Sequence, residues 1–241
     1  MTLADVIPVF PLPNVVFFPR MPLPLHIFEP RYRAMVRDAA QGARLIGMVL
    51  LRDDWERDYQ GNPPIFATGT VGEMVRVEEL ADGRFNIVLR GIREYAIVRE
   101  LARAPYREAM VTWRDPEGQP LPAGMRQAIT ELVRRYVERL GRDATPERLV
   151  PRSVDDETFV NFLAQHLDVS VLEKQALLEA PSLTERGRRL VDVLEFRLEE
   201  LRMQVGSSSR GHSPLDLSPV DRGQSAEDSS WAWLRLRPVR G

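Results

Sequence analysis

Two incompatible backbone patterns meet in residues 22–36, PLPLHIFEPRYRAMV, and this junction constrains the fold more than any other stretch. Residues 22–28 carry too many prolines for a helix and alternate like an edge strand. Pro30 suits the first position of a helix, where its missing N–H group costs nothing and its fixed φ angle is already helical. Glu29 adds a carboxylate at the positive end of that helix. The sequence therefore predicts a strand that turns into a helix at one corner.

The predicted helix has one apolar face. Apolar side chains recur there at three- and four-residue steps, and Gly42 follows as a helix terminator. The members of this face are Tyr32, Met35, Val36, Ala39 and Ala40. Because such a face must be buried, the helix is expected to pack against the strands around it.

Residues 5–115 form a strand-rich zone. Residues 45–51, LIGMVLL, make a continuous apolar run of strand length, as expected for a strand buried on both faces. Asp82 and Gly83 give a strong hairpin signal and predict antiparallel pairing of residues 73–80 with residues 84–90. Gly91 is expected to interrupt the second arm before further strands follow. Several short strands and one helix predict a small, closed or strongly curved sheet.

Residues 120–205 form a helical zone. Apolar stripes run from Met125 to Leu140 and from Phe159 to Leu167. Two capping boxes, opened by Ser170 and by Ser182, each predict the start of a further helix. The last helix runs from Ser182 to Val205 and would span about 36 Å. Three shorter helices and one long helix predict a bundle with a single core.

Residues 206–241 have too little apolar content to bury and are predicted to be disordered. The segment ends in WAWLRLRPVRG, where tryptophans and leucines stand among arginines. This ending suits a linear motif for a partner or an acidic surface. The plainer alternative is an unselected tail, because chain termini are usually unordered.

Composition narrows the class of protein. The net charge of −2 gives no global basic field for nucleic acid or an acidic membrane. The chain has no cysteine, which excludes disulfides and thiol catalysis. The N-terminus lacks the pattern of a signal peptide, and no apolar stretch is long enough to span a membrane. We expect a soluble cytoplasmic protein that does not bind membranes.

The residues needed for catalysis or for metal binding do not gather in the sequence. Lys174 is the only lysine, so neither a phosphate-binding loop with its lysine nor a serine–lysine dyad has support. His26, His166 and His212 are far apart and have no cysteine companions, which favours structural roles for His26 and His166 over a metal site. We therefore expect no enzyme activity, no cofactor, no metal and no catalytic residue.

The order of these segments resembles the N-terminal, substrate-binding domain of the Lon proteases. The resemblance covers about residues 5–205, and residues 28–33, FEPRYR, are its most specific element. It runs through IPVFPLPNVVFFPRMPLPLHIFEPRYRAMVRDA, RLIGMVLL, GTVGEMVRVEEL, GRFNIVLRGIREY and KQALLEAPSLTERGRRLVDVLEFRLEEL.

The resemblance implies an α+β fold. A PUA-like β-barrel subdomain with one packed helix, residues 5–115, would precede a C-terminal helical bundle with a long last helix, residues 120–205. The nucleotide-binding and protease modules of a full Lon protease would follow that domain but do not appear in this sequence. The chain is therefore expected to be a stand-alone member of the family.

The family's role implies recognition of unfolded or misfolded polypeptide. We expect a binding module, either an adaptor or a holdase, with a protease or chaperone as a further partner. At the strand-to-helix corner, an aromatic side chain beside helix N–H groups and a guanidinium could hold an extended polypeptide. Tyr32 could instead be core, Arg31 is expected to be exposed, and a purely architectural corner is the simpler alternative. The candidate peptide-binding residues are Phe18, Met21, Phe28, Glu29, Arg31 and Tyr32.

RNA binding is the alternative function, because PUA-like barrels often serve RNA. The arginines that would contact phosphates alternate with Glu94, Glu100 and Glu108, as in a solvated face of mixed charge. RNP-type aromatic clusters are absent as well. Nucleic acid is therefore not the expected partner. The arginines in question are Arg84, Arg90, Arg93, Arg99, Arg103 and Arg107.

Overall fold

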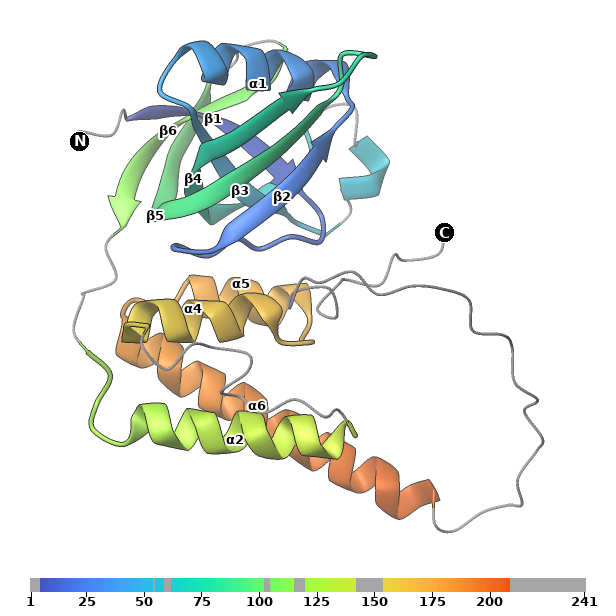
Figure 1. The fold of residues 1–241 in the computed structure, drawn as a ribbon, viewed down its shortest axis with the longest axis vertical. Helices are drawn as coiled ribbons and strands as arrows, with labels where there is room; N and C mark the ends of the chain where they lie inside the picture. Colours follow the sequence, from blue (N-terminus) through green and yellow to red (C-terminus); the bar gives the residue numbers. More distant parts are fainter. Residues whose placement is uncertain are drawn as a thin grey trace. The chain divides into compact units, whose positions relative to one another are not determined.

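The computed structural model is a mixed α+β structure, as predicted, with one six-stranded sheet and five α-helices in the part of the chain that it describes (Figure 1). It describes residues 5–53, 55–58, 62–101, 105–114, 120–141 and 154–208. The chain divides into two compact units, Met1–Leu198 and Glu199–Gly241, and all contacts below belong to the first. The elements are β1 (Val6–Leu12), β2 (Pro22–Ile27), α1 (Pro30–Gln41), β3 (Leu45–Leu51), the 3-10 helix η1 (Trp55–Asp58), β4 (Ile65–Glu79), β5 (Phe85–Leu101), β6 (Arg107–Arg114), α2 (Met125–Arg139), α4 (Asp156–His166), α5 (Val171–Leu178) and α6 (Leu183–Ser208).

The sheet has the order β2-β5-β4-β3-β1-β6, and β6 pairs with β5 as well. Only the β1–β3 pair is parallel among these pairings. The predicted hairpin is confirmed, because β4 and β5 pair on either side of a turn in which Leu80 N–H donates to the Arg84 carbonyl. Gly83 supplies the positive φ angle of 77° that this turn needs. β3 is buried along its whole length, as the apolar run predicted.

The expectation that Gly91 interrupts the second arm of the hairpin is wrong, because β5 continues through it. Gly91 instead allows another segment to approach closely. A Cβ atom at this position would lie 2.3 Å from the Phe18 carbonyl oxygen. The Gly91 N–H group donates to the Met21 carbonyl, and the Gly91 carbonyl accepts from Arg20 N–H, both at 2.9 Å. Gly91 thus anchors the segment that leads into β2.

The strand-to-helix corner has the predicted form. Glu29 is the N-cap residue of α1 with extended backbone angles, and Pro30 is the first helical residue. Tyr32, Met35 and Val36 are buried, as their spacing predicted. The Tyr32 ring lies 4.2 Å from the ring of Phe10 in β1, which ties the first turn of α1 to the sheet.

The helix starts predicted at Ser170 and Ser182 are also confirmed. Asp155 caps α4 through a 2.8 Å hydrogen bond from Thr158 N–H, and this bond lowers the pKa of Asp155. Ser170 and Glu173 form the predicted capping box of α5. The Ser182 hydroxyl accepts from Glu185 N–H at the start of α6. α6 ends at Ser208, so residues 206–208 are helical where the sequence predicted disorder. The rest of the predicted tail, with its WAWLRLRPVRG motif, lies outside the described residues.

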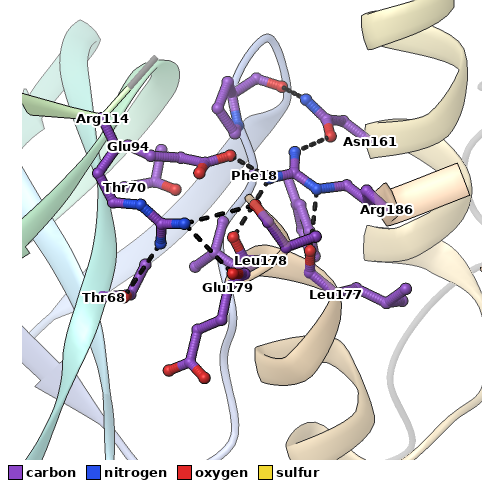
Figure 2. Close-up of polar contacts among 12 residues, drawn as sticks. Phe18, Thr68, Thr70, Glu94, Arg114, Asn161, Leu177, Leu178, Glu179 and Arg186 are labelled. Atoms are coloured by element: carbon purple, nitrogen blue, oxygen red, sulfur yellow. Dashed lines mark hydrogen bonds and ion pairs between the residues drawn. The ribbon is translucent and has the colours of Figure 1, made fainter. Parts of the chain in front are cut away.

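A buried guanidinium joins the sheet to the helices (Figure 2). Arg186 in α6 and Glu94 in β5 are both fully buried and form an ion pair. Arg186 also donates to the Asn161 side chain at 2.6 Å. Its remaining bonds go to the carbonyls of Leu177 and Leu178 at the end of α5, at 2.9 and 3.2 Å. Burial raises the pKa of Glu94, while the positive charge of Arg186 opposes that shift.

Neighbouring polar contacts extend this junction (Figure 2). Arg114 in β6 donates to the Thr68 hydroxyl at 3.1 Å and to the carbonyl of Glu179 at 3.2 Å. Gln175 in α5 donates to the Thr68 carbonyl at 3.1 Å. Asn161 in α4 donates to the Pro19 carbonyl at 3.2 Å, so it links Arg186 to the segment before β2. Side chains of α4 and α5 thus hold backbone atoms of the segment before β2 and of the sheet, and Arg114 of the sheet bonds the backbone at the end of α5.

Removing one partner of the Arg186–Glu94 pair should be strongly destabilising. Arg186→Met leaves the Glu94 carboxylate buried without its counter-charge, and we expect a loss of about 3–5 kcal/mol in the free energy of unfolding. Urea denaturation would measure this loss.

Arg188→Met is the control. It removes an arginine that is 64 % exposed on the same helix and should change stability by less than about 0.5 kcal/mol. The double variant Glu94→Leu with Arg186→Met should lose less than the two single changes together. A loss below about 1 kcal/mol for Arg186→Met would contradict the role of this pair.

Candidate functional site

Phe28 is the exposed member of the predicted corner. It follows the last residue of β2, and its side chain is 61 % exposed. The ring stacks on His26 with a centroid separation of 6.4 Å. An aromatic side chain this exposed contributes little to the core, so a binding role for it is compatible with the fold.

The charged residues of the corner are engaged with one another. Arg31 donates to the Glu29 carboxylate at 3.0 Å, and the two side chains are only 22 % and 17 % exposed. The Arg31 guanidinium also lies 4.6 Å from the centre of the Tyr32 ring. Arg31 is therefore largely covered, whereas the sequence led us to expect an exposed guanidinium. Tyr32 is part of the core, which is one of the two possibilities that the sequence allowed for it.

The structure does not bring Phe18 and Met21 to the surface beside Phe28. Their side chains are 0 % and 3 % exposed. Phe18 lies under the Arg186 guanidinium at 5.6 Å, and its N–H group donates to the Gln165 side chain at 3.2 Å. These residues lie at the other end of β2 from Phe28 and cannot touch a polypeptide on this surface. A peptide-binding role for the six predicted residues stays a hypothesis.

Sequence reasoning missed the polar contacts of His26, the residue whose ring stacks on Phe28. His26 Nδ1 lies 2.8 Å from the Asn86 side-chain oxygen, and His26 Nε2 lies 3.2 Å from Arg84. Arg84 in turn bonds Asp82 at 2.6 Å. These contacts depend on the strand register, which places His26 opposite Asn86. No local signal could have revealed it, because β2 and β5 are separated by the whole of α1, β3 and β4.

Histidine and lysine side chains elsewhere have structural bonds. His166 Nδ1 lies 2.8 Å from the Phe162 carbonyl, and burial lowers the pKa of His166. Lys174 donates to the Gln165 carbonyl at 2.7 Å, and burial lowers the pKa of Lys174. In the described part of the chain, no three histidine, cysteine, aspartate or glutamate side chains are grouped so that they could hold a metal ion. None of the described helices is long and apolar enough to cross a membrane.

Residues 6–195 match the family model described as the ATP-dependent protease La (LON) substrate-binding domain. The chain belongs to this family. It is 26 % identical over 216 residues to Lon protease 2 of Myxococcus xanthus and 28 % identical over 212 residues to the Lon protease of Parabacteroides distasonis. These matches cover 86 % and 83 % of this chain but 26 % and 25 % of the relatives. The chain thus spans about a quarter of the length of these Lon proteases.

Solved structures of Lon N-terminal domains have a similar fold. The Lon N-terminal domain protein from Xanthomonas campestris matches with a TM-score of 0.58 and 24 % identity. The N terminal domain of the Mycobacterium avium complex Lon protease matches with a TM-score of 0.61 and 19 % identity. Each match covers 79 % of this chain and 98 % of the other. At these identities the likeness concerns the fold alone.

The arginines considered for RNA binding in this Lon-family chain are mostly engaged with other side chains. Arg99 is exposed, and Arg103 lies outside the described residues. The Arg93 guanidinium lies 5.8 Å from the centre of the Trp113 ring. The other three predicted arginines each face a carboxylate: Arg84 with Asp82, Arg90 with Glu73, and Arg107 with Glu100. Such pairs offer little net positive charge to a phosphate backbone, so the contacts do not favour RNA.

RNA should bind only weakly and should be lost at physiological salt. Binding that neutralised several phosphates would weaken by roughly 10³-fold between about 50 and 200 mM salt, because released counterions drive it. Fluorescence anisotropy with a structured RNA, measured across this salt range, would check the expectation. Sub-micromolar binding that persists at about 150 mM salt would instead make RNA the favoured ligand.

Proposed function

We propose that this chain is a non-catalytic module that binds unfolded or misfolded polypeptide, acting as an adaptor or as a holdase. The support is its membership of a substrate-binding domain family of a protease. The observation that carries the site is Phe28, which is 61 % exposed at the strand-to-helix corner. A protease or a chaperone would be its further partner.

The chemistry around Phe28 suits a client without a required charge. The neighbouring polar groups are paired with one another: Glu29 with Arg31, and His26 with Asn86 and Arg84. Binding an apolar client side chain at Phe28 would therefore leave these pairs intact. Apolar contact at an exposed aromatic residue, framed by satisfied polar groups, is a common source of affinity at interfaces. In this proposal Glu29 and Arg31 border the site, and Tyr32 packs the first turn of α1 against β1. Phe18 and Met21 anchor the other end of β2.

The scaffold of this module is proposed to be a PUA-like β-barrel, residues 5–115, followed by a helical bundle, residues 120–205. Pairing that runs from β5 through β4, β3, β1 and β6 and returns to β5 supports the barrel. Buried stripes on α2, α4 and α6 support the bundle. The similarity to solved Lon N-terminal domains is consistent with both.

The absence of enzyme activity is part of the proposal. The match concerns the substrate-binding domain of Lon, and the sequence holds a single lysine, Lys174, whose amine is bonded to the Gln165 carbonyl. We expect the purified protein neither to hydrolyse ATP nor to cleave an unfolded protein, because ATP binding by a phosphate loop and serine–lysine proteolysis each need a lysine. Phosphate release and gel assays would check this. ATP turnover that copurifies with the protein through two columns would refute it.

Phe28→Ala should weaken polypeptide binding without affecting folding. We expect a loss of about 1 kcal/mol or more, roughly fivefold in Kd, for a reduced and carboxymethylated model protein. The unfolding free energy should hardly change, because the side chain is mostly exposed. Phe196→Ala is a matched control, since Phe196 is 59 % exposed in α6. Equal binding by parent and Phe28→Ala, or equal losses in both variants, would place the site elsewhere.

A further inference from the structure

β2 is the outermost strand of the sheet, and the side to which each of its residues directs its N–H and C=O groups can be assigned. Among the described strands it pairs only with β5. The Met21 carbonyl accepts from Gly91 N–H, so the backbone of Met21 faces β5. Alternate residues of a strand direct their N–H and C=O groups to opposite sides. The backbone groups of Pro22, Pro24 and His26 therefore lie along the outer edge.

This outer edge lacks most of the donors that another strand would need. Pro22 and Pro24 have no N–H group, so His26 supplies the one donor of the strand's outer edge. The Pro22 carbonyl already accepts from the Gln165 side chain in α4 at 3.2 Å. An added strand forms pairs of N–H···O bonds with every second residue of its neighbour. Along β2 it would find such a pair only at His26.

The end of β4 forms the opposite edge of this part of the sheet, and this edge is short. Beyond its pairing with β3, which ends at Glu73, β4 pairs only with β5 among the described strands. A bulge interrupts β4 between Met74 and Arg76. Arg44 already uses both backbone hydrogen-bonding groups of Met74. The Arg44 side chain donates to the Met74 carbonyl at 2.7 Å, and the Arg44 carbonyl accepts from Met74 N–H at 2.8 Å. Near the turn, Arg37 of α1 bonds Glu79 at 3.1 Å.

We propose that these edges exclude an added strand, with Pro22 and Pro24 as the residues that determine this, so that a bound polypeptide is held by its side chains. Prolines, bulges and covered ends are devices by which sheets avoid edge-to-edge pairing. The proposal rests on the proposed function for the nature of the client, but edge exclusion itself applies to any strand, including one from a second copy. A binder of unfolded chains gains from this arrangement, because it cannot template β-aggregation of its clients.

Restoring the missing donors tests edge exclusion without any client. Pro22→Val with Pro24→Val gives the outer edge two further N–H groups and side chains that favour strands. We expect the double variant to self-associate at concentrations where the parent's mass does not change, as measured by sedimentation velocity. Pro64→Val, at an exposed proline just before β4, is the control and should behave like the parent. A folded double variant whose mass also stays constant would overturn the proposal.

Backbone methylation of a client tests the binding mode. The probe is an uncharged peptide of about ten residues rich in phenylalanine and valine, compared with two forms N-methylated at alternate positions, which remove the donors of a strand on either side. We expect both methylated forms to bind within about threefold of the parent peptide, and a loss beyond about tenfold in either would overturn the proposal. If neither peptide nor unfolded protein binds, the proposed function fails. Edge exclusion is then still decided by the self-association of the double variant.

Discussion

The contact on which the rest of the structure depends is the buried guanidinium of Arg186. A charge without solvent is tolerated only where its hydrogen bonds are satisfied and an opposite charge is near. Arg186 meets both conditions through Glu94, Asn161 and two carbonyls at the end of α5. Those carbonyls belong to a helix C-terminus, whose partial negative charge also favours a cation. Because its partners come from β5, α4 and α5, one side chain links the sheet to the helices.

Local signals were sufficient for most elements but not for this contact. The hairpin turn at Gly83, Pro30 at the first helical position and the capping box of Ser170 each depend on residues close in sequence, so they could be predicted. Arg186 is partnered by residues 25 and 92 positions away. One signal was available, since Arg186 lies four residues before Leu190 and therefore continues the buried stripe of α6. An arginine on an apolar stripe indicates a buried partner, although it cannot name it.

The candidate site was predictable in the same uneven way. The sequence located the corner to which Phe28 belongs, because the change from alternation to helical spacing is local. It could not separate Phe28 from Phe18, since both end apolar runs and have a proline within two residues. Phe18 is buried by Arg186 and by Gln165, which lie far along the chain in α6 and α4. Only tertiary contact decides which phenylalanine faces solvent.

These same contacts connect the interior to the proposed surface. Arg186 holds Asn161, and Asn161 holds the Pro19 carbonyl. Gln165 holds Phe18 and Pro22 at the two ends of the segment that leads into β2. β2 then runs in register with β5 to Ile27, immediately before Phe28. The exposed ring is therefore positioned from both sides, by the helices at the start of β2 and by the Phe10–Tyr32 contact at the start of α1. Under the proposed function, a surface held in this way would offer a client a preorganised contact, so binding would not have to order the surface first.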